Sequence, residues 1–318
     1  MTASPRDDGA ESALLRLPDD VWRVVFNLLD AGDVVNLAST SKWIRSWLTP
    51  SVFCRAKCTW EMAKHRPPHP EIISQLRITN HSSYSEWSVD VFPRLRTYPK
   101  LQHLLINTID SASWLRYRRF PHLARLTLYH SSPAKKPRFF DLNSLNDFVC
   151  LTFLEIHDYH FLWSREAVPV VNLVEVVLVG CSWEFPFRLS QFNPGQFLER
   201  LSLSYQANDT FVNSQLLMEF LTKPDAEMDS LRRLEVACPR SLSPSTFNRL
   251  THNFTHLHQL KLTKWSVTTP KFVALYLNRA SLGKLTHLTV EIPDAEVAAD
   301  IEDQVHREFG GLYFFTSA

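Results

Sequence analysis

The chain has 318 residues, 45% of them hydrophobic and 21% charged, with 34 lysine and arginine side chains against 33 aspartates and glutamates. This length predicts about two domains, and this apolar content is enough to bury a sizeable core. A net charge of +1 argues against a protein whose main role is to coat nucleic acid or acidic membrane. Only 7 glycines are present, and neither GxGxxG nor GxxxxGKS/T occurs, so no Gly-rich phosphate loop is expected.

Cysteine usage and the N-terminal residues indicate a reducing compartment. Five cysteines, an odd number without regular spacing, do not suggest a disulfide framework. The opening sequence MTASPRDDGAES is polar and acidic, unlike a secretory signal peptide. The longest apolar stretch, residues 168–180, is too short for a bilayer, which needs about 20 apolar residues. We therefore expect a soluble intracellular protein, cytoplasmic or nuclear, without membrane contact.

The N-terminal region has the pattern of three short helices. Apolar residues recur at three- and four-residue steps after Pro18, whose fixed φ suits the first turn of a helix. Gly32 is expected to end this helix, and Asp33 to cap a second one. A third helical stretch begins near Ser41, and the helical pattern extends to about residue 60. Such a small bundle is marginal alone, so part of its apolar surface is expected to be buried against something else.

Changes in composition set the expected domain boundaries. The polar opening segment predicts a disordered tail. The sequence HRPPHP at residues 65–70 cannot be crossed by a helix, and the hydrophobic period changes after it. The expected parts are a tail at 1–12, a helical domain at 13–64, a junction at 65–72, repeats at 73–293, and a capping helix with its tail at 294–318.

From residue 73 onward an aliphatic residue recurs at positions 1, 4 and 6 of a repeated unit. The units begin about 26 residues apart on average, a regularity that is hard to obtain by chance. The nine triplets are Ile73-Leu76-Ile78, Leu101-Leu104-Ile106, Leu123-Leu126-Leu128, Leu151-Leu154-Ile156, Leu173-Val176-Leu178, Leu198-Leu201-Leu203, Leu231-Leu234-Val236, Leu257-Leu260-Leu262 and Leu285-Leu288-Val290.

This alternation predicts one short strand per unit. Positions 4 and 6 point to one side of the strand, and positions 3, 5 and 7 to the other. A single strand cannot bury its own leucines, so the units are expected to stack in parallel. Helix signals lie between strands at residues 211–221, at Ser243-Pro244 and at Thr269-Pro270, and Asp294 opens a C-terminal helix. The expected fold is α/β: three helices, then a curved solenoid with a parallel sheet on its concave side and helices and irregular segments on its convex side.

The helical region resembles an F-box. The match covers LLRLPDDVWRVVFNLLDAGDVVNLASTSKWIRSW, where the family pattern is LPxE/D, then IF, L, DL, and a final Ser/Cys-Lys-x-Trp-Arg. The family's tryptophan position holds Ile44 here, with Trp43 just before it. The matching positions are Leu17, Pro18, Asp20, Val21, Val25, Phe26, Leu29, Asp33, Val34, Leu37, Ser41 and Lys42.

The repeated region, residues 73–292, is similar to leucine-rich repeats. The position eight residues after the first aliphatic is usually Asn or Cys in that family, and here Cys181 alone fits. Irregular turns and divergent repeats are therefore expected. As a whole, the chain resembles an F-box protein with leucine-rich repeats.

The resemblance implies a substrate-recognition subunit of a Skp–cullin–F-box (SCF) ubiquitin ligase. Such a subunit binds a Skp-type adaptor, and through it a cullin and a RING subunit, while its repeats bind a target protein. It supplies proximity rather than catalysis, and needs no cofactor and no metal. The alternative is a non-catalytic scaffold that binds the adaptor without a cullin and assembles a protein complex.

Two sets of site residues follow from this resemblance. The adaptor surface is expected at Leu17, Pro18, Val21, Phe26, Leu29 and Leu37, with packing inside the bundle as the alternative for each. The substrate surface is expected on the concave face at Arg125, Tyr129, Glu155, His157, Arg200 and Lys261, with a solvated sheet face as the alternative. Because Tyr and Arg are the usual interface anchors, Arg125 and Tyr129 are the first candidates.

Other motifs carry less weight. Cys54, Cys58, His65 and His69 are potential zinc ligands, but their spacing is shorter than that of a usual finger, so zinc is not expected. The basic-aromatic segments 116–120 and 135–140 are either solvated loops with aromatic residues in the core or a site for an acidic or phosphorylated peptide, which the resemblance favours over nucleic acid. No GxSxG, HExxH or CxxC motif occurs, and an enzyme is not expected.

Overall fold

A computed structural model describes residues 18–52, 54–59, 71–79, 98–107, 120–129, 139–145, 148–162, 172–183, 197–204, 229–241, 243–266, 277, 284–292 and 294–317. The chain divides into two compact units, Met1–Arg55 and Ala56–Ala318. Several predicted features lie outside the described residues: the tail at 1–12, most of the junction at 65–72, and the helices expected at 211–221 and after Thr269. Among the described residues, no helix is both long enough and apolar enough to cross a membrane.

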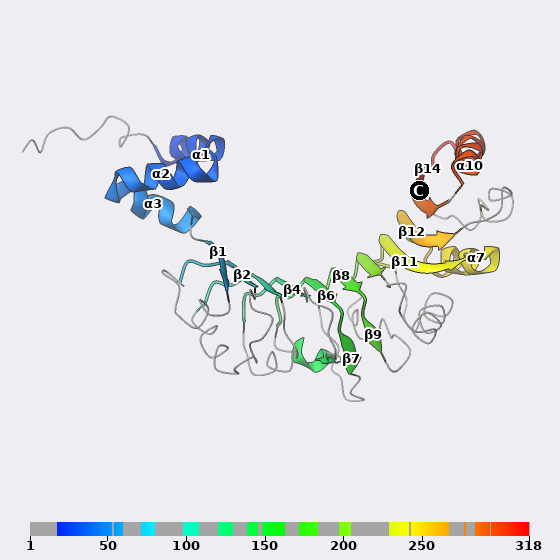
Figure 1. Cartoon of the computed structure of the whole chain (residues 1–318), viewed down its shortest axis with the longest axis horizontal. Coiled ribbons are helices and arrows are strands. Elements are labelled where there is room, and N and C mark those ends of the chain that lie inside the picture. Colours follow the sequence, from blue (N-terminus) through cyan, green and yellow to red (C-terminus); the bar gives the residue numbers. More distant parts are fainter. Residues whose placement is uncertain are drawn as a thin grey trace, which may run out of the picture. The chain divides into compact units, whose positions relative to one another are not determined.

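The first unit contains the three predicted helices: α1 (Asp19–Leu28), α2 (Ala31–Thr40) and α3 (Lys42–Val52) (Figure 1). The prediction for the turn between α1 and α2 is wrong in detail. Asp30, in extended conformation, caps α2, and its carboxylate accepts a hydrogen bond from the Asp33 backbone N–H at 2.8 Å. Gly32 therefore lies inside the first turn of α2, and α1 ends ahead of it at Leu28, with Leu29 as its C-cap.

Aromatic residues make the core of the first unit. Trp22 is only 3% exposed, and its ring stacks on Phe26 with the centroids 5.2 Å apart. The Trp43 ring of α3 approaches Trp22 at 6.1 Å, so one buried indole connects α1 with α3. Ile44 and Leu48 of α3 are buried as well.

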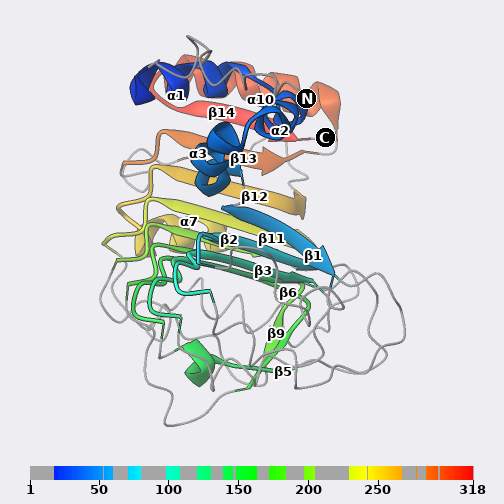
Figure 2. The ribbon, with the colours of Figure 1, turned by 90° about the vertical axis from the view of Figure 1, so that its left-hand side faces the viewer.

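The second unit is built on an eleven-stranded sheet in which every described pairing is parallel (Figures 1 and 2). All nine strands predicted from the aliphatic triplets are present, and a tenth and eleventh lie at the two ends. In spatial order, the strands are β1 (Arg55–Thr59), β2 (Gln75–Thr79), β3 (His103–Asn107), β4 (Arg125–Tyr129), β6 (Phe153–His157), β8 (Glu175–Val179), β10 (Arg200–Ser204), β11 (Arg233–Ser241), β12 (Gln259–Ser266), β13 (His287–Glu291) and β14 (Tyr313–Ser317).

Equivalent positions of the repeat are aligned across the sheet. Leu104 of β3, for example, pairs with Leu76 on one side and Leu126 on the other. Positions 4 and 6 thereby form two continuous apolar rows, which are buried from β2 to β13. Burial of these rows against one another is the main force that stacks the units. The sheet is not closed, and it is compatible with a solenoid-like repeat.

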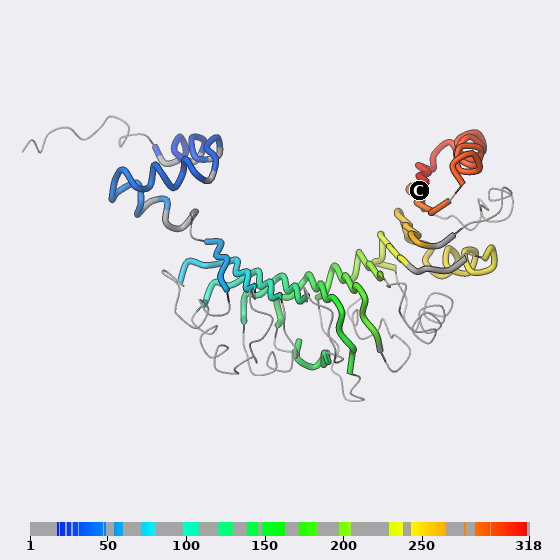
Figure 3. Tube along the Cα trace, in the orientation of Figure 1, coloured from blue at the N-terminus to red at the C-terminus, as the bar shows by residue number. Residues whose placement is uncertain are grey.

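Figure 3 shows the Cα trace running through the strands of the second unit, and a backbone hydrogen-bond pattern repeats from one of these strands to the next. The Ser74 carbonyl, at position 2, accepts from the backbone N–H groups of Gln102 and His103 at 2.8 and 2.9 Å. In each following unit, the carbonyl at position 2 likewise accepts two backbone N–H groups of the next unit. The last carbonyl to do so is that of His258. The main chain therefore has the same period as the leucines.

The two end strands were not predicted. Residues 55–59 were expected to continue a helix, but they form β1, which lies beside β2 and is therefore held by sheet pairing rather than by local helix propensity. β14 was expected to be a tail. Its unit is one residue shorter, because Leu312 stands directly before Tyr313, which pairs with His287. The triplet spacing of 1, 4 and 6 consequently misses it.

Aromatic residues precede several strands and close the turns that lead into them. Leu101 donates its backbone N–H to the carbonyl of Tyr98, and the same bond joins Leu123 to Phe120 and Leu257 to Phe254. These aromatic side chains are buried. Phe120 therefore lies in the core, as one interpretation of segment 116–120 expected; the basic residues of both basic-aromatic segments lie outside the described residues.

The remaining described elements connect the strands. A second parallel sheet contains β5 (Phe139–Asp141), β7 (His160–Leu162) and β9 (Ser182–Trp183), and a 3-10 helix, η4, follows β5 (Leu142–Leu145). Residues 139–140 thus belong to a strand rather than to a loop, with Phe140 buried. α7 (Pro244–Asn253) starts at the predicted Ser243 cap, and α10 (Ala295–Glu308) at the predicted Asp294 cap.

Candidate partner-binding surfaces

The first unit exposes large apolar side chains on two of its helices. Val24 and Leu28 of α1 are 60% and 81% exposed, and Val35 of α2 is 54% exposed. Val21 lies three residues before Val24 and seven before Leu28, so these three share one face of α1. Trp22, on another side of the same helix, is buried. α1 is therefore apolar on more than one face, and only one of them is used inside the unit.

The predicted adaptor residues divide by exposure. Pro18 and Val21 are exposed, whereas Phe26, Leu29 and Leu37 are half-buried, and Phe26 stacks on Trp22. Leu17 lies outside the described residues. Val24, Leu28 and Val35 were not among the predicted site residues. For Val24 and Leu28, the signal was the number of apolar positions on α1, which exceeds what one buried stripe needs.

The other candidate surface is the side of the eleven-stranded sheet that carries repeat positions 3, 5 and 7, called the open face here. Its side chains alternate with the buried rows and are mostly half-buried or exposed. The structure places all six predicted substrate residues on this face: Arg125 and Tyr129 on β4, Glu155 and His157 on β6, Arg200 on β10, and Lys261 on β12.

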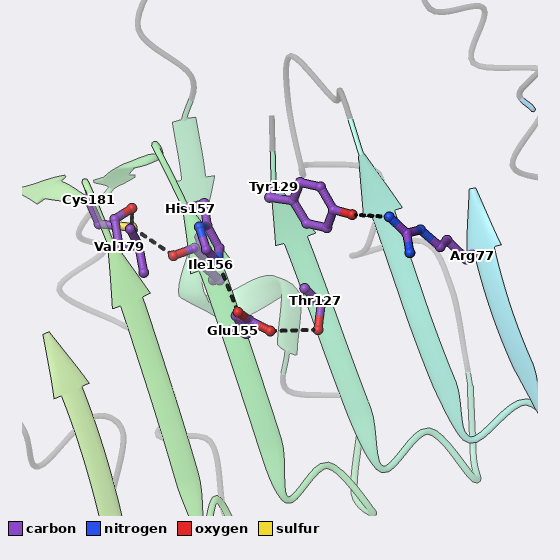
Figure 4. A network of polar contacts seen from close by, with 8 residues as sticks. All are labelled: Arg77, Thr127, Tyr129, Glu155, Ile156, His157, Val179 and Cys181. Carbon is purple, nitrogen blue, oxygen red and sulfur yellow. Dashed lines mark hydrogen bonds and ion pairs between the residues drawn. The ribbon is translucent and has the colours of Figure 1, made fainter. Parts of the chain in front are cut away.

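Glu155 is the centre of a polar network on the open face (Figure 4). His157 Nε2 donates to Glu155 Oε1 at 2.9 Å, and Thr127 Oγ1 donates to Glu155 Oε2 at 3.2 Å. The hydrogen bond from His157 is the largest influence that lowers the pKa of Glu155, and partial burial opposes it. Both carboxylate oxygens of Glu155 are therefore occupied by neighbours on the face.

Tyr129 is also engaged within this face (Figure 4). Arg77 reaches from β2 across β3 and donates from Nη2 to the Tyr129 hydroxyl at 2.9 Å. The rings of Tyr129 and His157 lie 5.8 Å apart. The structure thus brings Tyr129, Glu155 and His157 together in one layer of contacts, as neighbours on adjacent strands.

The two predicted arginines have different surroundings. The guanidinium carbon of Arg125 lies 3.7 Å from the centroid of the Phe153 ring, a cation–π contact on the adjacent strand. Arg200 forms ion pairs with Glu175 at 2.9 Å and Glu235 at 3.0 Å, on the strands to either side. Glu175 and Glu235 were not predicted, although their repeat positions, 3 and 5, place them on this face.

Strands β11 to β14 carry a group of side chains that includes two cations without such partners. Within the described part of the chain, the side chains of Arg233 and Lys261 have no hydrogen-bond or ion-pair partner, and both residues are exposed. Tyr313 and Phe315 of β14 are 60% and 52% exposed. His287 stacks on Tyr313 with the ring centroids 4.9 Å apart. Arg233, Lys261, His287, Tyr313 and Phe315 are called the C-terminal patch.

The described residues contain two buried thiols and no group that could hold a metal ion. Burial raises the pKa of Cys58 to about 11 and that of Cys181 to about 12, so both thiols are protonated near neutral pH. Cys181 Sγ donates to the Ile156 carbonyl at 3.3 Å. Nowhere in the described ranges do three or more His, Cys, Asp or Glu side chains come together as metal ligands would. His65 and His69 lie outside these ranges.

Comparison with known protein families identifies the first unit. Residues 14–53 match the F-box domain, which supports an F-box protein. F-box domains typically bind Skp-type adaptors, and the match suggests an F-box adaptor of SCF-type ubiquitin ligases. The matched segment contains α1, α2 and α3, and therefore all of the exposed apolar residues of that unit named above. No curated protein matches the chain.

Proposed function

We propose that this protein is the substrate-recognition subunit of an SCF-type E3 ubiquitin ligase. The F-box binds the Skp-type adaptor, which connects the chain to a cullin and a RING subunit, and the second unit binds a target protein. The observation that carries the proposal is the F-box match at 14–53, on a unit with exposed apolar helices, followed by a separate parallel sheet with a polar face. The protein has no catalytic residues of its own, and it acts in the cytoplasm or the nucleus.

The second unit is best explained as a leucine-rich-repeat solenoid. Three features support this: the aliphatic triplets, the aligned buried rows, and the backbone bond pattern that begins at Ser74. Cys181 supports it as well, because its thiol donates to the Ile156 carbonyl of the neighbouring unit from the position where the family usually has Asn or Cys. A solenoid of this kind presents a long face to a partner.

The adaptor surface combines the residues indicated by the F-box pattern with those that the structure exposes. Val21, Val24 and Leu28 form its apolar centre on α1, and Val35 adds to it from α2. Their burial against the adaptor stabilises the complex by roughly 25 cal/mol per Å² of apolar surface removed from water. Pro18, Phe26, Leu29 and Leu37 contribute mainly by fixing the helices, since three of the four are half-buried.

Ubiquitin transfer in this proposal depends on proximity. The adaptor and the cullin hold the conjugating enzyme near a target bound to the open face, so that an intermolecular transfer becomes effectively intramolecular. The chain's own contribution is binding geometry, which explains why polar residues of the open face can be devoted to recognition rather than to acid–base chemistry.

The test is a pull-down of the tagged full chain against the Skp-type adaptor and the cullin. We expect both partners to be recovered with the unaltered chain and lost with a Val24→Asp/Leu28→Asp variant, because charges at an apolar interface are costly to bury. Both side chains are exposed, so the variant should fold. The matched control is Val149→Asp, an equally exposed apolar residue of the second unit, which should keep both partners.

Two other outcomes have distinct meanings. Recovery of the adaptor without the cullin would favour a scaffold that assembles a protein complex without ubiquitin transfer. Recovery of neither partner with the unaltered chain would refute the proposal as a whole.

A further inference from the structure

The C-terminal patch differs from the rest of the open face because, among the described residues, its two cations have no hydrogen-bond, ion-pair or aromatic partner. Two carboxylates of the described strands, those of Glu235 and Glu291, face the same side nearby. Glu235 already bridges to Arg200 at 3.0 Å, and a Glu291 carboxylate oxygen accepts the backbone N–H of Lys264. Arg233 on β11 and Lys261 on the adjacent strand β12 are both exposed. Within the described ranges, the patch therefore carries two positive charges without a carboxylate partner.

Exposed aromatic residues stand beside this charge. The sheet register places Arg233 in the same row as His287 and Tyr313, and Lys261 in the same row as Phe315. With strands about 4.8 Å apart, Lys261 and Phe315 are separated by roughly 10 Å, and Arg233 and Tyr313 by roughly 14 Å. Tyr, Phe and Arg are residue types enriched at interfaces.

We propose that the C-terminal patch is the main substrate-binding site of this protein, and that it takes an extended acidic segment with an apolar side chain. This inference rests on the proposed function, which makes the open face the substrate surface. The segment's carboxylates pair with Arg233 and Lys261, and its apolar side chain covers Tyr313 and Phe315. In a β-extended chain, side chains four positions apart lie on one side about 14 Å apart, and in a polyproline II chain, side chains three positions apart lie on one side about 9 Å apart, so both separations match the patch.

Charge complementarity selects this occupant over others. A basic segment would be repelled by Arg233 and Lys261, and the carboxylates of Glu235 and Glu291 already accept hydrogen bonds from Arg200 and from the Lys264 backbone. A purely apolar segment would leave both cations to be desolvated without compensation, which is costly. An acidic segment with an apolar residue satisfies both components of the patch.

The experiment uses the full chain purified with the adaptor, and fluorescence anisotropy of labelled twelve-residue peptides. One peptide has two glutamates and, three residues later, a leucine in a Gly/Ser background. A second replaces the glutamates with lysines, and a third places the leucine next to the glutamates. We expect the first peptide to bind about tenfold more tightly than either of the others, with a preference that weakens as salt is added.

Three variants locate the site. Lys261→Glu and Phe315→Ala should each weaken the first peptide about tenfold or more. Arg249→Glu makes the same charge change on exposed α7, whose Phe247 and Leu250 belong to the buried core behind the sheet, and should have no effect.

The overturning results are specific. Equal affinity for the glutamate and lysine peptides, including no detectable binding of either, refutes the inference. An effect of Lys261→Glu no larger than that of Arg249→Glu also refutes it. A dimer of the chain that dissociates on Phe315→Ala would assign the patch to self-association. If the adaptor does not co-purify but the peptide preferences hold for the chain alone, the proposed function fails while the binding site stands.

Discussion

The central strands and the C-terminal strands of the open face share one backbone design but use their polar side chains in opposite ways. From β2 to β10, the polar groups mostly bind one another: Arg77 with Tyr129, Glu155 with His157, and Arg200 with two glutamates. From β11 to β14, Arg233, Lys261 and two aromatic residues face solvent. Polar residues on a repeat face are therefore not equivalent, and those with occupied donors and acceptors contribute more to rigidity than to recognition.

The largest effect should be the same in both parts, because their buried sides are the same. Leu154 of β6 and Leu288 of β13 occupy repeat position 4, and both are fully buried. We expect Leu154→Ala and Leu288→Ala each to lower the free energy of unfolding by about 3 kcal/mol through lost contacts and the cavity left behind. Urea denaturation of the two variants measures this. A loss at Leu288 much smaller than at Leu154 would mean that the C-terminal strands are loosely packed.

The last strand should depend on one carboxylate of α10. Glu302 Oε1 accepts the Thr316 backbone N–H at 3.2 Å and the Thr316 hydroxyl at 2.8 Å, which satisfies donors on the edge strand of the sheet. We expect Glu302→Ala to cost about 1–2 kcal/mol and to speed amide hydrogen exchange at Thr316. Asp303→Ala, an exposed carboxylate of the same helix, is the control and should change neither quantity.

A direct comparison of two cations should separate structure from recognition. Arg200→Ala leaves Glu175 and Glu235 without their shared partner, and we expect it to lower stability by about 1 kcal/mol, since the ion pairs are partly solvated. Lys261→Ala removes a cation without a partner among the described residues, and should change stability by less than about 0.5 kcal/mol. Thermal denaturation checks both. Equal losses would show that Lys261 is part of the folded network after all.

The smallest effect should depend on pH. The pKa of Glu155 is lowered from its ordinary value of 4.5, so folding favours its ionised form. That contribution is present above pH 4.5 and is lost as the pH falls through the folded-state pKa. We expect Glu155→Gln to reduce stability by about 0.5 kcal/mol at pH 7, after allowance for solvent screening, and by less near pH 4. Parallel denaturation curves at the two pH values test this. A deficit that does not shrink on acidification would contradict the assignment to this carboxylate.

Much of the second unit could be predicted because its information is local and periodic. A triplet such as Leu151-Leu154-Ile156 defines a strand, its buried side and its register in one step, since the side-chain period of a strand is two. The same logic placed Arg125, Tyr129 and Lys261 on the open face. It did not reach β1 or β14, because β1 follows a helical pattern and the β14 unit is one residue shorter.

The F-box pattern was equally readable from the sequence, but the exposed residues of that unit were not. Val24, Leu28 and Trp22 are all large apolar residues of α1, and a sequence contains no mark for which of them turns inward. The choice is made by the approach of Trp43 from α3 to Trp22, a contact between residues distant along the chain.

The repeat period, the strands and the buried rows could be derived from the sequence alone, because each of these depends on the spacing of residues that are neighbours along the chain. Which polar residues of the open face bind one another became visible only in the folded chain. Arg77 reaches Tyr129 across an intervening strand, and Arg200 lies between glutamates of two different units. Such pairings depend on whether a side chain can span the distance between neighbouring strands. The stacking of the units sets this distance, and the sequence of a single repeat does not contain it.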